Sequence, residues 1–186
     1  MTKIQDGTGT GRTASVTTNN RLAVASVNQE QDHFIAKDSG KVWSLTFKDV
    51  DPTAADDYFF YLKNTSTEFV CNISDIRIAS TVAGQLEINA VSGTAAGGTS
   101  ITPVSRLVNS VASPSGIAES GADITGLTSD GTLFLLTLEA AKTFQLKTSS
   151  RIIIPPGQAV GLLWGETTGI LSGTVSIYEE PIANVT

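Results

Sequence analysis

The sequence predicts an all-β protein, a jelly-roll-like β-sandwich of antiparallel strands preceded by an extended N-terminal arm. Composition is the first observation: 186 residues include 19 serines, 24 threonines and 17 glycines, and only 16% are charged, against about a quarter in an average domain. Such a composition is typical of short strands joined by turns. The second observation is the spacing of about eight to ten short apolar or alternating segments, with no helix between them long enough for a β-α-β crossover.

The first strand of the sandwich is expected at residues 42–48, VWSLTFK. Trp43, Leu45 and Phe47 fall on one face of it, and polar residues fall on the other, which indicates a half-buried strand. The next strand, YFFYLKN at 58–64, is aromatic on both faces. Both of its faces are therefore expected to be covered.

Further along the chain, the apolar positions of 69–79 change parity, which predicts a β-bulge near Ser74-Asp75. Residues 92–103 are expected to form a long loose loop, and 104–131 shows only a weak pattern. In 151–165, RIIIPPGQAVGLLWG, we expect two strands joined as a hairpin by a Pro-Pro-Gly turn. Other strands are expected at 86–89, 131–138 and 173–180.

The glycine-rich start, DGTGTGRTASVTTNNRL at 6–22, is not a phosphate-binding loop. Gly7, Gly9 and Gly11 give G-x-G-x-G rather than G-x-G-x-x-G, and neither a Walker lysine nor an amphipathic helix follows. We instead expect an arm that leads into a small hairpin, 14–18 with 21–27, turning at two asparagines. The predicted domains are therefore residues 1–28, the arm and short hairpin, and residues 29–186, the β-sandwich.

Charge and segment content limit the partners of this chain. The net charge is −6, the isoelectric point is about 4.7 and there is no basic patch, so no nucleic-acid partner is expected. No membrane association is expected either, because no apolar run approaches the roughly 20 residues of a spanning helix. The start has no signal-peptide pattern and Cys71 is the only cysteine, which favours a chain folded in a cytosol. The sequons at Asn64, Asn72 and Asn184 are then attributed to chance.

Residues that could carry chemistry do not combine into a motif. The only histidine, His33, lies in a polar segment, and Cys71 alternates with core residues, so no catalytic residue, metal site or cofactor is predicted. The acidic residues of 49–57 are interpreted as a solvated turn rather than a Ca²⁺ loop, although the sequence leaves Ca²⁺ open. A glycosidase needs two carboxylates facing each other across a cleft. The glutamates that offer material for such a pair are Glu87, Glu119, Glu139, Glu166, Glu179 and Glu180.

The N-terminal segment resembles the start of small virion structural proteins of tailed bacteriophages. The matching residues are Asp6-Gly7-Thr8-Gly9, Ala14, Val16 and Asn20-Arg21-Leu22, followed by the YLKN strand at 61–64 and the Pro-Pro-Gly at 155–157. The resemblance implies a jelly-roll protein, either a decoration (cement) protein on the virion capsid surface or a close relative used in fibres or tail parts, synthesised in the host cytoplasm and commonly trimeric. Its implied partner is the major capsid protein. The group has no defined catalytic set to carry over.

The arm is the part of the sequence that we expect to bind this partner. An extended arm can add a strand to a neighbouring sheet through backbone hydrogen bonds alone. The residues assigned to this role are Asp6, Gly7, Gly9, Gly11, Arg12, Val16, Asn20, Arg21, Leu22 and Val24. The doubly apolar strands 58–62 and 133–138 additionally favour a homotrimer.

Three functions are therefore weighed. The first is a structural virion protein, not an enzyme, that decorates and stabilises the capsid by clamping neighbouring major capsid subunits. The alternative is a fibre or tail-associated β-sandwich module that binds host glycan or another virion protein. A glycosidase or esterase on a β-sandwich is the third.

Overall fold

The structure is a computed structural model that describes residues 41–182 together with the short segments 3–5 and 13–15; for 3–5, 13–15 and 148–151 only the backbone is described. The chain divides into two compact units, Met1–Glu30 and Gln31–Thr186. In the first unit, β1 (Lys3–Gln5) pairs antiparallel with β2 (Thr13–Ser15), a pairing that the sequence analysis did not foresee. Most of the hairpin expected at 14–18 and 21–27, and the boundary expected after residue 28, lie outside the described residues.

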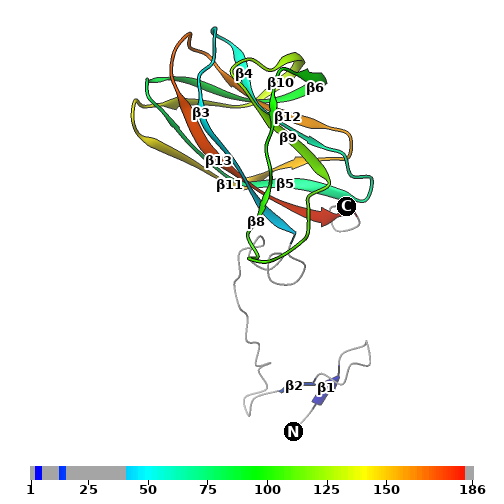
Figure 1. Ribbon diagram of the computed structural model, residues 1–186. Helices are drawn as coiled ribbons and strands as arrows, with labels where there is room; N and C mark the ends of the chain where they lie inside the picture. Colours follow the sequence, from blue (N-terminus) through cyan, green and yellow to red (C-terminus); the bar gives the residue numbers. More distant parts are fainter. Residues whose placement is uncertain (1–2, 6–12, 16–40, 183–186) are drawn as a thin grey trace. The chain divides into compact units, whose positions relative to one another are not determined.

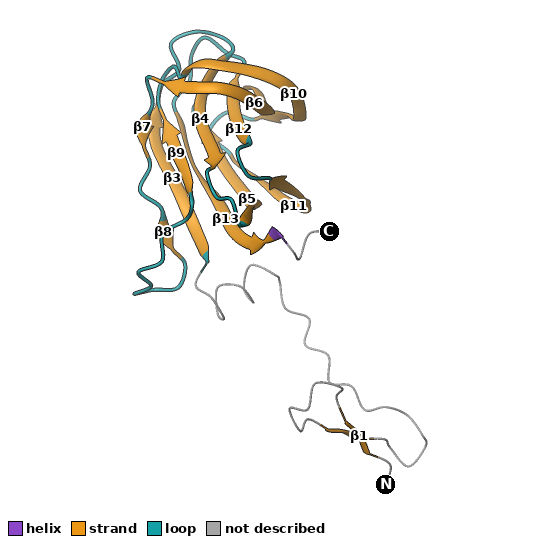
Figure 2. Ribbon diagram, turned by 90° about the vertical axis from the view of Figure 1, so that its right-hand side faces the viewer, coloured by secondary structure: helices purple, strands orange, loops and turns teal. Residues whose placement is uncertain are grey.

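The second unit is a sandwich of two antiparallel sheets, which confirms the predicted fold class (Figure 1, Figure 2). One sheet has six strands in the order β10-β6-β12-β4-β9-β7, and the other has five in the order β11-β5-β13-β3-β8. Their bounds are β3 (Val42–Val50), β4 (Asp57–Asn64), β5 (Phe69–Ser80), β6 (Gly84–Ala96), β7 (Thr99–Ser100), β8 (Val104–Ser105), β9 (Gly116–Ser120), β10 (Thr125–Leu138), β11 (Thr143–Ile154), β12 (Ala159–Trp164) and β13 (Leu171–Pro181).

The order of strand pairing makes this sandwich a jelly roll. β3 pairs with β13, β4 with β12, β5 with β11, and β6 with β10. The pairs are thus nested: the first long strand of the body pairs with the last, the second with the second last, and so on inward. A hairpin nested in this way and rolled up, so that successive pairs alternate between the two sheets, is the jelly-roll arrangement.

The part of the sequence between β6 and β10 was predicted only in part. Residues 92–103 are not a loose loop throughout, because β6 continues to Ala96 and β7 follows; in the weakly patterned 104–131, β8 and β9 form and β10 begins at Thr125, while 106–115 and 121–124 lie outside strands. The reason is that most side chains in this part of β6 and β10 are exposed. Their strands pair through the backbone, so no alternation of apolar residues marks them in the sequence.

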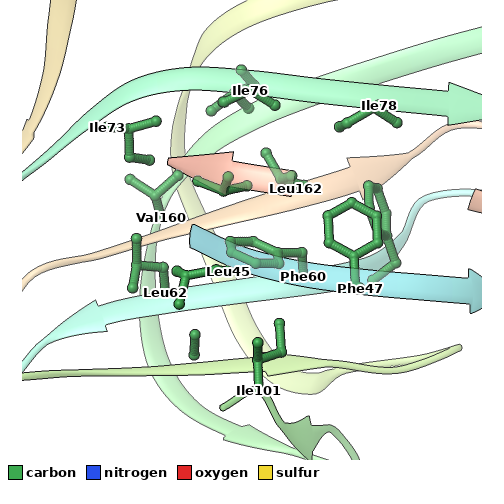
Figure 3. Packing of buried hydrophobic residues seen from close by; sticks show 14 of the residues in the cluster. Leu45, Phe47, Phe60, Leu62, Ile73, Ile76, Ile78, Ile101, Val160 and Leu162 are labelled. Carbon is green, nitrogen blue, oxygen red and sulfur yellow. The ribbon is translucent and has the colours of Figure 1, made fainter. Parts of the chain in front are cut away.

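The core lies between the two sheets and is built from the alternating positions that the sequence indicated (Figure 3). Trp43, Leu45 and Phe47 point inward from β3, and all three are at most 3% exposed. A bulge in β4 places two successive phenylalanines, Phe59 and Phe60, in this core, and each ring centroid lies 5.6 Å from that of Phe47. The bulge predicted in 69–79 is confirmed. In the pairing of β5 with β13, Ser176 lies opposite Asp75 and Ile177 opposite Ile73, so Ser74 of β5 is the bulged residue.

The outer face of the six-stranded sheet carries a second, smaller cluster around Tyr58 and Tyr61. Ile124, in the segment after β9, packs over these rings and is 2% exposed. The ring of Tyr58 lies against Gly161, where an added Cβ would come within 2.7 Å of it. Both faces of β4 are therefore covered within the chain itself, as the sequence predicted. The surplus apolar surface that 58–62 seemed to offer to a homotrimer is thus already used.

The Pro-Pro-Gly turn does not close a hairpin, contrary to the sequence-based expectation. β11 belongs to the five-stranded sheet and β12 to the six-stranded sheet, so the turn carries the chain from one sheet to the other. The connection from β4 to β5 makes the opposite crossing. The two crossings meet at Asn64, which is 1% exposed.

Asn64 bonds to both crossing segments through its side-chain amide and through its backbone N–H and carbonyl. Its side-chain Nδ2 donates to the carbonyl oxygens of Ile154 (2.8 Å) and Phe69 (2.9 Å), and its Oδ1 accepts from the N–H of Ser66 (2.9 Å). Its backbone N–H donates to the carbonyl of Gln158, and its own carbonyl accepts from the N–H of Gly157. A buried amide with every group paired fixes the two crossings relative to each other.

Replacing this amide is therefore expected to destabilise the body strongly. Asn64→Ala leaves the carbonyls of Phe69 and Ile154 without their donor, at a cost of roughly 2–4 kcal/mol in the free energy of unfolding. Asn89→Ala is the matched control, because Asn89 is equally buried on a strand, but its Oδ1 has no hydrogen-bond partner among the described residues. Urea unfolding of the full chain measures both. An Asn64→Ala loss no larger than the Asn89→Ala loss would contradict the role of the junction.

Candidate functional site

Of the residues considered for catalysis, those that the structure describes do not gather in one place. His33 lies outside the described residues, and Cys71 faces the core at 1% exposure, where burial, and secondarily the charge of Glu179, raises the pKa of its thiol to about 12. A thiol with so high a pKa is not a nucleophile at neutral pH, in line with the inert thiol that the sequence indicated. The glutamates lie on different elements: Glu87 on β6, Glu119 on β9, Glu139 and Glu166 in loops, and Glu179 and Glu180 on β13.

The acidic loop between β3 and β4 uses one of its own carboxylates to hold itself. Asp57 Oδ2 accepts hydrogen bonds from the N–H and hydroxyl of Thr53, at 3.1 and 3.2 Å, and from the N–H of Ala54 at 2.7 Å. Within 41–182, no three His, Cys, Asp or Glu side chains gather closely enough to hold a metal ion. This geometry is that of a turn closed by its own aspartate.

Glu179 is a buried carboxylate with a raised pKa. It lies opposite Cys71 on the inner side of β13 and is 4% exposed. Its Oε1 accepts the N–H of Ser115 at 2.5 Å, and its Oε2 lies 3.5 Å from the hydroxyl of Ser115. Burial raises the pKa of Glu179, and the hydrogen bonds from Ser115 and the charge of Lys41 oppose this only in part. The carboxylate therefore ties the loop before β9 to β13.

Glu180 follows on the opposite face of β13, because successive residues of a strand alternate. Its Oε2 accepts a hydrogen bond from Nδ2 of Asn72 at 3.2 Å. Glu179 and Glu180 thus do not face each other across a cleft, and they do not form the carboxylate pair of a glycosidase. Asn72 and Asn64 are both buried, so neither of these sequons is open to a glycan in the folded chain.

The structure does not place the arm residues proposed to bind a partner. All ten lie outside the described residues, in 6–12 and 16–40: Asp6, Gly7, Gly9, Gly11, Arg12, Val16, Asn20, Arg21, Leu22 and Val24. What is described on either side of the glycines is the β1–β2 pair, in which Lys3 lies opposite Ser15 and Gln5 opposite Thr13. The assignment of the arm as a binding element therefore stays a prediction.

A surface that sequence reasoning missed lies on and after β8. We define the valine loop as residues 104–111, which carry four exposed apolar side chains. Their exposed fractions are 63% for Val104, 43% for Leu107, 81% for Val108 and 98% for Val111. Exposed apolar side chains so close in the sequence make this loop a candidate for contact with another molecule.

The valine loop is attached to β3 by two hydrogen bonds and closed by one of its own. The N–H of Arg106 donates to the carbonyl of Val42 at 2.9 Å, and the N–H of Ser110 donates to the carbonyl of Leu107 at 2.9 Å. The indole N–H of Trp43 anchors the end of the loop through the carbonyl of Ala112, at 3.0 Å. These bonds hold the backbone at Arg106, Ser110 and Ala112, and the valines between and beside these points are exposed. In the sequence, apolar residues at irregular spacing gave no signal for this loop.

Comparisons with protein-family models, with curated proteins and with solved structures gave no match to this chain. Over the described part of the chain, none of the structure is a helix long and apolar enough to cross a membrane.

Because the pKa of Glu179 is raised, we expect that removing its charge stabilises the fold, and that the size of this effect depends on pH. A carboxyl group whose pKa is higher in the folded than in the unfolded chain stabilises the fold at low pH, and this stabilisation is lost as the pH rises through the folded value. Glu179→Gln keeps an oxygen for the N–H of Ser115 but cannot ionise. We therefore expect the Tm of this variant minus that of the natural chain to grow as the pH rises from about 4 through neutral pH.

Thermal unfolding across this pH range measures the effect. Glu68→Gln is the matched control, because Glu68 is exposed and its replacement removes the same charge from the surface. A difference between the Glu179→Gln variant and the natural chain that is constant with pH, or that falls as pH rises, would refute the cause given for the shift.

Proposed function

We propose that this chain is a structural virion protein that decorates a capsid and stabilises it by clamping neighbouring major capsid subunits. The observation that carries the proposal is the combination of a jelly-roll body that presents an ordered apolar loop with a separate N-terminal unit. The resemblance of the arm to small virion proteins of tailed bacteriophages supplies the class of partner. In this proposal the chain is not an enzyme.

The body suits a part that is wedged between subunits. Its core is continuous between two sheets, and both tryptophans are buried with their indole N–H groups bonded, Trp43 to Ala112 and Trp164 to the carbonyl of Thr168. The low share of charged residues limits the desolvation cost of contacts with a neighbouring surface. A stiff body of this kind transmits force between the subunits it joins.

Two elements of the chain would make the contacts. The valine loop offers apolar anchors that are already held in place, so little conformational entropy is lost when a partner covers Val108 and Val111. The arm would add strands to a neighbouring sheet through its backbone. Electron microscopy of the particle separates this function from its alternative: density over the capsid shell supports decoration. Density at a fibre or tail tip supports the glycan-binding or tail module instead.

Removing the arm should separate attachment from folding. The described core begins at Val42, so deletion of residues 1–28 is expected to change the Tm of the body by no more than a few degrees. Attachment to capsids of the virus that encodes the chain, measured as occupancy by electron microscopy, should fall sharply. Wild-type occupancy of the truncated chain would show that the arm is not an anchor. A failure to fold would show that the arm belongs to the body.

Charging the valine loop tests the second contact. Val108→Asp and Val111→Asp place a charge at positions that are 81% and 98% exposed, so the Tm should stay within about a degree of the natural value. Capsid occupancy should fall about tenfold or more if these valines enter an apolar pocket. Ser100→Asp, on the exposed short strand β7, is the matched control and should leave occupancy unchanged. Equal occupancy of all three variants would exclude the loop from the contact.

A further inference from the structure

The 106–115 segment, which carries most of the valine loop, lies outside the strands and is attached to the body at separate points. Hydrogen bonds with β3 hold its start and its middle. Its last residue, Ser115, is held on both sides: its N–H donates to Oε1 of Glu179 at 2.5 Å, and its carbonyl accepts from the hydroxyl of Thr65. Among these contacts, only that with Glu179 uses a group that ionises between acidic and neutral pH.

Glu179 lies where a negative charge is unfavourable. Its side chain is on the inner side of β13 and is 4% exposed, and this burial raises the pKa of its carboxyl. The described elements around it bring two titratable groups, Lys41 and Cys71. The charge of Lys41, just before β3, and the hydrogen bonds from Ser115 offset the effect of burial only in part. Cys71, opposite on β5, has a pKa of about 12 and stays a neutral thiol.

The attachment of Ser115 is therefore coupled to the ionisation of Glu179. Oε1 of Glu179 accepts the N–H of Ser115 and Oε2 lies 3.5 Å from its hydroxyl, so detachment of the segment opens both carboxyl oxygens to water. In the detached state the glutamate pKa returns toward its usual value of about 4.3. Because the attached state binds the proton more tightly, attachment is most stable at low pH and weakens as the pH rises through the higher, attached-state pKa.

We propose that Glu179 is a pH-sensitive switch for the 106–115 segment: the neutral carboxyl keeps the segment on β13, and the charged carboxylate releases it more often. The neutral carboxyl still accepts the N–H of Ser115 through its carbonyl oxygen. Release is a local opening, in which the body stays folded and the start of the segment stays bonded to β3 through Arg106.

The consequence for a partner is weaker binding at higher pH. Release frees the end of the valine loop that carries Val111, which is 98% exposed. A partner that fits the attached loop then binds only the fraction of chains in which the loop is attached. This consequence rests on the proposed function, whereas the switch itself is a property of the isolated chain.

Hydrogen exchange of the isolated full chain between about pH 4 and pH 8 tests the switch. After correction for the intrinsic dependence of exchange on pH, the opening constant of the Ser115 amide should rise by up to about tenfold per pH unit. The rise should begin near pH 4.3, the usual glutamate value, and level off above the folded pKa of Glu179. An opening constant that does not change with pH would overturn the proposal.

The two tryptophans show how far the opening extends. The indole N–H of Trp43 donates to Ala112 within the segment, and that of Trp164 donates to Thr168 outside it. Exchange of the Trp43 indole should follow the Ser115 curve, and exchange of the Trp164 indole should not. An equal rise at both indoles would mean that the whole body loosens, and a rise at Ser115 without Trp43 would mean that the loop is not released; either result contradicts the switch.

Removing the ionisable group provides the second arm of the test. Glu179→Gln keeps an oxygen for the N–H of Ser115 and cannot ionise, so the segment should stay protected at every pH. Glu68→Gln, at an exposed glutamate, is the matched control and should keep the natural pH dependence. A natural pH dependence in the Glu179→Gln variant would refute the switch.

A titration of the natural chain replaces this arm if the Glu179→Gln variant does not fold. The carboxyl carbon signal of Glu179, followed by NMR in ¹³C-labelled protein, should titrate with the midpoint at which the opening constant of Ser115 levels off. Midpoints that differ by more than about one pH unit would refute the coupling.

Capsid occupancy at about pH 5.5 and pH 8 separates the switch from the proposed function. The natural chain should lose occupancy at the higher pH relative to the Glu179→Gln variant. If the exchange results hold and the two chains keep equal occupancy at both pH values, the switch stands and the valine loop is excluded from the capsid contact.

Discussion

The jelly roll depends on the junction at Asn64, where the chain crosses between the sheets twice. Its amide donates to the carbonyls of Ile154, the last residue of β11, and of Phe69, the first residue of β5, and its backbone bonds to the Pro-Pro-Gly turn and the residue after it. A sandwich held only by apolar contacts can slide one sheet over the other, because such contacts have no direction. Directional bonds at one buried point set the register of the two sheets, so the core side chains meet as Figure 3 shows.

The sequence predicts the fold well where one face of a strand is buried, and poorly where neither is. The alternation of Trp43, Leu45 and Phe47 and the change of parity at Ser74 follow from burial, and both were predictable. The β7–β9 insertion and the far end of the β6–β10 pair are held by backbone pairing with exposed side chains, which leaves no periodic signal. The Pro-Pro-Gly turn was misread because the sequence shows the turn but not the sheet of each flanking strand.

Much less of the candidate site was predictable. The contact of Glu179 with Ser115 joins residues that are distant in the sequence, and nothing local distinguishes Glu179 from the exposed glutamates. The valine loop is recognisable only once its exposure is known, whereas the surplus of apolar residues in 133–138 was visible in the sequence.

The nested strand order also sets the order in which the body can form during synthesis. The local pair is β6 with β10, whereas β3 is completed only by β13, with Trp43 opposite Ile177. On the ribosome, the apolar face of β3 therefore emerges long before the strand that covers one of its edges. Chains dominated by such distant pairings fold slowly and expose aggregation-prone segments in the meantime. The apolar face of β3 thus stays open to other chains until β13 has been made.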